Sequence, residues 1–376
     1  MKVLIDASSI NKKNTLASIP IFILRLIDAF IAHSPCDVAL LIDADFKDYF
    51  EKKYPSILKY TVKRNFVLYR LPIIGSIYGR NVYRKSIRNI NCDIGIIASD
   101  LDRSTRIKTT FKRIQVLFDL KAVKDGSFFQ KYRNKLFYDF IIKSADAIVV
   151  SSNYTKTDVL RTFSVPPRKI KVIPCSVEPL TIRNVPNIDC PSKFILYVNT
   201  LLPHKNAITL IKAFEKIQKT NDVDLVLVGK ETSYWKKVLL PYIRNHNLGS
   251  RIFLFQNLTR DELQFLYNKS SLFVTPSLRE GFGYTPIEAA LSRIPVISST
   301  CEALPDSTQN LLNYYSPAKD YNALAKKITE ILSSPPSQEH LNAIAAKYTE
   351  DYSPQKQVER FMIVFSQIQS SQSDTI

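Results

Sequence analysis

The sequence predicts an α/β protein made of two successive domains, each with a parallel sheet. Short β-branched segments alternate with stretches of helical periodicity from the first residue onward, which is typical of parallel-sheet α/β domains. The alternation stops once, over the Pro- and Asn-rich residues 174–192, and then starts again. A chain of 376 residues is long enough for two domains with their own cores. We therefore expect domains over 1–178 and 179–352, and a C-terminal segment over 353–376.

Both expected sheets alternate strands with helices. The first domain should contain strands at Val3–Asp6, Val38–Asp43, Phe66–Leu71, Ile94–Ala98, Ile114–Phe118, Ala147–Val150 and Ile170–Ile173, with clear helices at Pro20–Ala32 and Phe128–Ser144. The second should contain strands at Phe194–Val198, Leu225–Val228, Ile252–Phe255, Leu272–Val274 and Val296–Ser298, with helices at Asn206–Lys219, Trp235–His246, Asp261–Lys269 and Pro286–Ser292. The C-terminal segment should contain a last helix at Gln355–Gln369. Ligands of such sheets bind beyond the carboxyl ends of the strands.

The chain is strongly basic, since 52 Lys and Arg against 34 Asp and Glu leave a formal charge of +18. This balance favours an anionic partner: nucleic acid, anionic lipid or a phosphorylated substrate. We expect no nucleic-acid partner, because no helix-turn-helix, zinc spacing or RNP-like motif is present. A Walker sequence, a complete dinucleotide fingerprint and a Ser/His/Asp order are also absent.

Cysteine usage and hydropathy predict a cytoplasmic protein without a membrane span. The five cysteines are scattered, odd in number and without metal spacing, which is typical of reduced thiols. Met1 leads directly into an expected strand, so no signal peptide is expected. The most apolar stretch, Ile19–Leu26, is short and contains Arg25.

The segment 271–305 organises the second domain. It predicts a strand, a loop with Gly281 and Gly283, a helix and a further strand. Thr285 is the expected N-cap of the helix, and Pro286 its first residue. Backbone N–H groups and the positive end of a helix then face the ends of the strands, an arrangement that binds anions and hydroxyl-rich ligands.

Two carboxylates, Glu280 and Glu288, bracket this loop eight residues apart. Because the residues between them form a loop and a first helical turn, both can face one crevice. Glu288 also has a purely structural interpretation, since Thr285-x-x-Glu288 fits a capping box, as does Thr259-x-x-Glu262. The spacing leaves both interpretations of Glu288 open, whereas Glu280 at a loop tip has the weaker structural explanation.

The motif Glu280-Gly281-Phe282-Gly283-x4-Glu288 resembles the signature of the family 4 retaining glycosyltransferases, the glycosyl transferases group 1. Leu304-Pro305-Asp306 is similar to that family's Leu-Pro-Glu. The resemblance covers most of residues 110–350 and implies the GT-B fold. In that fold two Rossmann-like domains face a central cleft, the first binding the acceptor and the second the nucleotide sugar, and a C-terminal helix crosses back to the first domain.

The resemblance also implies roles for individual residues. Glu280 would orient the donor sugar, and Glu288 would hold the ribose hydroxyls. The other donor-binding residues of the loop would be Gly281, Phe282, Gly283 and Thr285. Pro203-His204-Lys205-Asn206 resembles the family's Pro-Arg-Lys-Asn segment, so Lys205 and His204 would hold the diphosphate at a helix N-terminus; the alternative for Lys205 is a solvated surface lysine. We expect no metal and no cofactor, since the lysine and the helix dipole can replace a cation.

The first domain departs from the family pattern. Its first loop, Asn11–Ser18, contains no glycine where the family's is glycine-rich, and Phe118 stands where many members have a histidine that contacts the sugar. Asp119 remains, and would either contact an acceptor hydroxyl or cap the following turn. The sequence is therefore compatible with two alternatives. The protein is either an active glycosyltransferase or a catalytically impaired GT-B protein that serves as a binding or scaffold protein.

Basic and aromatic residues are interleaved between Lys47 and Arg113, where basic residues outnumber acidic ones roughly three to one. The aromatic residues among them include Tyr54, Tyr60, Phe66, Tyr69, Tyr78 and Tyr83. Such a surface favours peripheral contact with an anionic membrane, and the alternative is a dispersed solvated surface with the aromatics in the core. The predicted function is transfer of a hexose, with mannose as a candidate, from a nucleotide sugar to a lipid-linked glycan at the inner face of the membrane, in polysaccharide biosynthesis.

Overall fold

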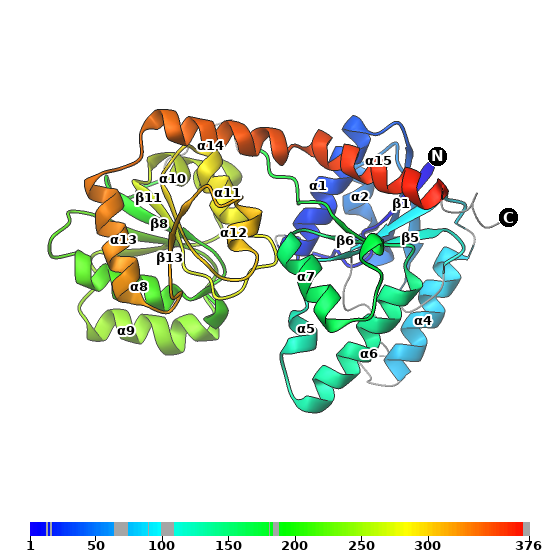
Figure 1. Cartoon of the computed structure of the whole chain (residues 1–376), viewed down its shortest axis with the longest axis horizontal. Coiled ribbons are helices and arrows are strands. Elements are labelled where there is room, and N and C mark those ends of the chain that lie inside the picture. Colours follow the sequence, from blue (N-terminus) through cyan, green and yellow to red (C-terminus); the bar gives the residue numbers. More distant parts are fainter. Residues whose placement is uncertain are drawn as a thin grey trace. The chain divides into compact units, whose positions relative to one another are not determined.

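A computed structural model describes residues 1–12, 14–15, 17–63, 74–88, 90–98, 109–179, 181–182 and 188–370, except the side chains of 74–76 and 80. The chain divides into two compact units (Figure 1). Unit 1 comprises Met1–Ser176 together with Pro354–Ile376, and unit 2 comprises Val177–Ser353. The chain therefore passes from unit 1 to unit 2 and back again.

Unit 1 contains a seven-stranded parallel sheet of order β3-β2-β1-β4-β5-β6-β7. Its strands are β1 (Lys2–Asp6), β2 (Asp37–Asp43), β3 (Leu58–Val62), β4 (Ile94–Ile97), β5 (Lys112–Leu117), β6 (Ala147–Val150) and β7 (Ile170–Val172). The sequence analysis missed β3, a partly exposed edge strand whose polar and apolar residues alternate. The strand expected at Phe66–Leu71 lies outside the described residues.

The helices of unit 1 are α1 (Ser18–His33), α2 (Lys47–Lys53), α4 (Ile74–Ile87), α5 (Lys121–Lys124), α6 (Phe128–Ser144), α7 (Asn153–Thr162) and α15 (Pro354–Ser370). The last of these returns to unit 1, as expected, and packs along α1. Phe30 of α1 contacts the rings of Phe361 and Phe365, and Gln357 Nε2 donates to the carbonyl of Pro174 at 2.9 Å. None of the described helices combines the length and the apolar character needed to cross a bilayer.

Helices α4 and α6 cover the same face of the unit 1 sheet. Leu4 of β1 pairs in register with Gly95 of β4. On the next two strands of the sheet, Leu117 of β5 pairs in register with Val150 of β6. Tyr83 and Ile87 of α4 cluster with Leu4, whereas Phe137, Tyr138, Ile141 and Ile142 of α6 cluster with Leu117 and Val150. Since residues of one face alternate along each strand, these clusters share a face.

Unit 2 contains a six-stranded parallel sheet of order β10-β9-β8-β11-β12-β13. Its strands are β8 (Phe194–Val198), β9 (Asp224–Val228), β10 (Ile252–Phe255), β11 (Leu272–Thr275), β12 (Val296–Ser299) and β13 (Asn313–Tyr315). Its helices are α8 (Ala207–Ile217), α9 (Leu240–Asn245), α10 (Arg260–Lys269), α11 (Tyr284–Leu291), α12 (Leu304–Ser307), α13 (Tyr321–Ser333) and α14 (Gln338–Asp351). The short strand β13 was not predicted.

The strand order of unit 2 creates a topological switch point between β8 and β11. From this pair the chain proceeds outward through β9 and β10 on one side and through β12 and β13 on the other. Connections that leave a parallel pair in opposite directions open a crevice beyond the carboxyl ends of the two strands. The loops that follow β8 and β11 are therefore the expected place for a ligand.

Candidate functional site

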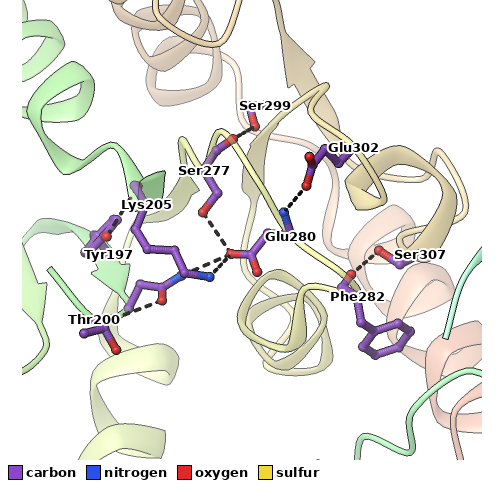
Figure 2. Close-up of polar contacts among 10 residues, drawn as sticks. Tyr197, Thr200, Lys205, Ser277, Glu280, Phe282, Ser299, Glu302 and Ser307 are labelled. Carbon is purple, nitrogen blue, oxygen red and sulfur yellow. Dashed lines mark hydrogen bonds and ion pairs between the residues drawn. The ribbon is translucent and has the colours of Figure 1, made fainter. Parts of the chain in front are cut away.

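One carboxylate, that of Glu280, joins the loops that follow β8 and β11 (Figure 2). Lys205 Nζ donates to Glu280 Oε1 at 2.7 Å, and Ser277 Oγ donates to the same oxygen at 2.9 Å. Asn199 Nδ2 donates to it as well, at 3.3 Å. Lys205 and Asn199 lie 75 and 81 residues from Glu280 in sequence, so the cluster forms only when the two strands pair.

The Lys205–Glu280 ion pair is largely shielded from solvent but still reachable, because the two side chains are 16% and 13% exposed. Burial, followed by the negative charge of Glu280, raises the pKa of Tyr197 well above its ordinary value. Tyr197 is therefore a protonated donor, and its hydroxyl donates to the carbonyl of Lys205 at 3.5 Å. A ligand that enters this site meets a balanced pair of charges rather than a single cation.

The backbone around the ion pair is held from several directions. The Glu280 N–H donates to Glu302 Oε2 at 3.1 Å, and the Leu278 N–H donates to the carbonyl of His204 at 2.8 Å. Asn206, buried and left-handed with φ of 58°, donates through Nδ2 to the carbonyls of Pro276 and Ala318, each at 2.9 Å. These bonds fix the loop after β8 against the loop after β11.

Gly229, directly after β9, is needed for the close approach of a neighbouring loop. A Cβ at this position would lie 2.1 Å from the backbone oxygen of Asn199, a distance that requires the backbone to move. Asn199 in turn donates its N–H to the carbonyl of Val228 at 3.0 Å. The chain has only 8 glycines, and it uses this one where the site residue Asn199 leaves its strand.

The expected capping box at Thr285 is wrong. Helix α11 begins at Tyr284 and its N-cap is Gly283, whose φ of 90° suits glycine, so Thr285 lies inside the first turn. The box predicted at Thr259 and Glu262 is present, with both reciprocal hydrogen bonds. Glu288 therefore does not cap α11 through Thr285. It lies half-buried in the second turn of the helix, so its capping-box interpretation is wrong.

Phe282 packs inward rather than toward a ligand. Its side chain is 4% exposed and contacts the ring of Tyr352 edge-on, with 5.6 Å between centroids. Its carbonyl accepts a hydrogen bond from Ser307 Oγ (Figure 2). Phe282 thus anchors the loop, and its side chain does not face a ligand site.

Residues near the ends of β9 and β10 border the same edge of the sheet. The Glu231 N–H donates to Gln256 Oε1 at 3.0 Å, which ties the segment after β9 to the segment after β10. His204, adjacent to Lys205, is half-buried. Among the described residues, no group of three or more His, Cys, Asp or Glu side chains is arranged to hold a metal ion.

The predicted site residues of unit 1 have local partners. Asp119 Oδ1 accepts the N–H of Lys121 at 2.8 Å, so Asp119 caps the turn that begins α5. Phe118 packs edge-on against Phe22, with 4.9 Å between centroids. In the first loop Asn14 Oδ1 accepts the N–H of Asn11 at 2.8 Å, and the described residues of this loop have negative φ, so their conformations do not require glycine.

The site residues that the sequence analysis missed are Asn199, Ser277 and Glu302. Each follows a strand of the switch-point region at its carboxyl end, so the general rule for parallel sheets could have singled them out. No motif marks them, because their role depends on which strands are neighbours.

Two family models match this chain. The model for glycosyl transferases group 1 matches residues 180–348, and the model for glycosyltransferase family 4 matches residues 118–179. Together they cover more than half of the chain. The protein belongs to this family of glycosyltransferases, as its motifs indicated.

Curated relatives and solved structures agree with this assignment. The O-antigen chain mannosyltransferase RfbU of Salmonella typhimurium is 27% identical over 62% of this chain and 63% of its own length. The serotype-specific mannosyltransferase WbdA of Escherichia coli is 28% identical over 42% of this chain and 20% of its own length. This chain thus matches less than two thirds of the length of each of these relatives.

Solved structures resemble the chain over nearly its whole length. Sucrose-phosphate synthase from Thermosynechococcus elongatus has a TM-score of 0.76 at 17% identity and covers 99% of this chain and 100% of its own. HepE from Anabaena, solved in complex with UDP, has a TM-score of 0.72 at 14% identity and covers 97% and 99%. These likenesses confirm the predicted GT-B fold class.

Proposed function

We propose that the protein is a retaining glycosyltransferase that moves a hexose from a nucleotide sugar to a glycan acceptor in polysaccharide biosynthesis. The observation that carries the proposal is the Lys205–Glu280 cluster at the switch point of unit 2. Mannose is the favoured hexose, because RfbU and WbdA are described as mannosyltransferases. The acceptor is a lipid-linked glycan, and the basic charge of +18 suits an enzyme that works at the anionic inner face of a membrane.

The donor is held by unit 2. Lys205 and His204, together with the N–H groups around Gly281–Thr285 at the start of α11, face the diphosphate, which gains negative charge as it leaves. Glu280 accepts hydrogen bonds from the sugar hydroxyls, and Glu288 from the ribose hydroxyls. Lys205 can turn from Glu280 toward a phosphate oxygen once the sugar replaces it as a donor to the carboxylate.

In the reaction, the bond between the sugar's anomeric carbon and the diphosphate oxygen breaks, and a bond to the acceptor oxygen forms on the same face. The acceptor's proton passes to the leaving diphosphate, so the products are a glycoside and a nucleoside diphosphate. Asp119 of unit 1 contacts an acceptor hydroxyl through the oxygen that does not cap α5. No metal or cofactor is assigned a role, since Lys205 and the helix N-terminus supply the positive charge.

The donor site is tested by thermal unfolding in the presence of a panel of sugar nucleotides and nucleoside diphosphates. A ligand present at 100 times its Kd should stabilise the native state by about 2.7 kcal/mol. We expect one base to give this shift in the wild type, and Glu288→Ala to lose it. Glu262→Gln is the matched control, because Glu262 caps α10 and a glutamine can fill the same box.

If none of the nucleotides shifts the thermal unfolding of the protein, donor binding is contradicted. Phe118, which packs on Phe22 at the position of the family's histidine, favours the second candidate, a GT-B protein that binds a donor without turnover. Release of nucleoside diphosphate in the presence of a lipid-linked acceptor separates the two: product accumulation supports the enzyme, and a thermal shift without product supports the binding protein.

A further inference from the structure

Helix α6 carries a continuous stripe of large apolar side chains that face solvent. The stripe consists of Phe128, Phe129, Tyr132, Leu136 and Phe140, which are 78%, 82%, 61%, 55% and 40% exposed. Phe128 and Phe129 begin the helix, and the other three follow Phe129 at spacings of three or four residues, which places the stripe along one side of the helix. Single exposed apolar residues are ordinary, but five on adjacent turns form a patch that calls for a partner.

The opposite side of α6 packs against the core of unit 1. Phe137, Tyr138, Ile141 and Ile142 are buried against the sheet of unit 1. Asn134 Nδ2 donates to the carbonyl of Ala122 at 2.6 Å, and Ser127 with Gln130 forms a capping box that fixes the helix start. The position of α6 is thus determined without the stripe, which remains outside the core.

The charges around the stripe select the kind of partner. Lys131, Arg133 and Lys135 are exposed on the turns that carry the stripe, and the acidic Asp139 is paired with Lys143 at 2.7 Å. Apolar side chains surrounded by cations match an anionic bilayer, into which the rings insert while the cations meet the lipid headgroups. A second copy of the chain fits less well, because the same cations would face each other.

Helix α4, which covers the same face of the sheet, also has exposed apolar and basic residues. Ile77 is 50% exposed, and the basic Arg84, Lys85 and Arg88 near the helix end are exposed. In contrast, Tyr54 and Tyr83 of the predicted basic-aromatic surface are 6% and 1% exposed, so they belong to the core. Phe66 and Tyr69 lie outside the described residues. Among the described residues, the most exposed aromatic side chains are therefore those of α6.

We propose that the exposed face of α6 is a docking surface for an anionic lipid bilayer. The proposal locates the membrane contact of the proposed function on a helix to which no motif pointed. It is independent of the donor site, because no residue of α6 belongs to unit 2.

Sedimentation with phosphatidylcholine vesicles, with and without phosphatidylglycerol, tests the surface. Replacing Phe128 and Phe129 together by serine should lower binding to the anionic vesicles at least tenfold. Changing Lys131 and Lys135 together to glutamine should lower it roughly thirtyfold, and only for the anionic vesicles. The matched controls are Ile363→Ser, which removes a 57% exposed residue of α15, and Lys237→Gln with Lys326→Gln, which removes the same charge from unit 2.

Fluorescence gives an independent readout, since the only tryptophan, Trp235, is 5% exposed in the core of unit 2. Phe129→Trp should show a blue-shifted emission when anionic vesicles are added, whereas the wild type should not change. Vesicle binding equal to wild type in both double variants, or unchanged emission, would overturn the proposal. So would a dimer in light scattering that the serine variant dissociates, because a second copy would then cover the stripe.

The outcome for α6 can be separated from that for the donor site. The thermal shift with the sugar nucleotide should be the same in the α6 variants as in the wild type. A protein that keeps this shift but does not bind vesicles retains the donor site and refutes only the docking surface.

Discussion

The carboxyl edges of the two sheets are built from similar loops but use their polar side chains differently. In unit 2, Glu280 accepts hydrogen bonds from Asn199, Lys205 and Ser277, which come from the loops of two strands. In unit 1, Asp119 and Asn14 bond to backbone groups within a few residues. The first pattern joins two loops through one carboxylate, and the second shapes individual loops.

This contrast is consistent with the different ligands that the proposed function assigns to the two units. A nucleotide sugar carries a diphosphate whose charge must be met at fixed positions, and long-range bonds across a switch point provide such rigidity. A glycan acceptor offers mainly hydroxyls, which a loop of locally capped turns can accommodate. The departures from the family pattern, Phe118 and the glycine-free first loop, both lie in unit 1.

The largest expected effect separates the two edges directly. Glu280→Gln keeps an acceptor for Lys205 but removes the negative charge, so kcat/KM for transfer should fall about 100- to 1,000-fold. Because Lys205 then has less competition, free nucleoside diphosphate should bind more tightly in this variant. Asp119→Asn keeps the oxygen that caps α5 and should lower kcat/KM only about tenfold. Equal losses in the two variants, measured by initial rates, would remove the distinction between the edges.

A smaller effect concerns the close approach at β9. Gly229→Ala should destabilise the protein by about 2–3 kcal/mol and weaken donor binding, because its Cβ meets the backbone oxygen of Asn199. Gly249→Ala is the matched control, since a Cβ there has no neighbour within 4 Å, and its stability should change by less than about 1 kcal/mol. Chemical denaturation of both variants measures the difference. If the two variants have similar midpoints of chemical denaturation, the loop after β8 moves away from the added Cβ without a loss of stability.

The smallest effect compares one polar side chain from each edge, the hydroxyl of Ser277 and the carboxamide of Asn14. Ser277→Ala removes one donor to Glu280 and should weaken donor binding about fivefold with little change in stability. Asn14→Ala removes the bonds to Asn11 and Ser9, and should cost about 1 kcal/mol of stability while donor binding is unchanged. Titration calorimetry and thermal unfolding together measure the pair. A loss of donor affinity in the Asn14 variant would contradict the separation of roles.

Much of the fold followed from the pattern of residues. Helix α6 begins and ends at the predicted residues, and strand β8 matches its predicted range, because periodicity and caps act over a few residues. The errors have physical causes as well. The N-cap of α11 was predicted at Thr285 because of its residue type, with Pro286 as the first helical residue. In the structure the left-handed Gly283 is the N-cap, so the helix begins two residues before Pro286. Strands β3 and β13 are short edge strands, whose signal is weak.

The sequence by itself determined the two α/β units and the family, and it singled out Glu280, Glu288 and Lys205 as candidate site residues, because periodicity and motif spacing are local properties of the chain. Only the tertiary structure showed that Lys205 and Glu280 form an ion pair, that Gly229 makes room for Asn199, and that the stripe on α6 faces solvent. These facts depend on which strands are neighbours and on which side of a helix meets the sheet. Both are decided by packing between residues far apart in the sequence, and helical periodicity alone does not record them.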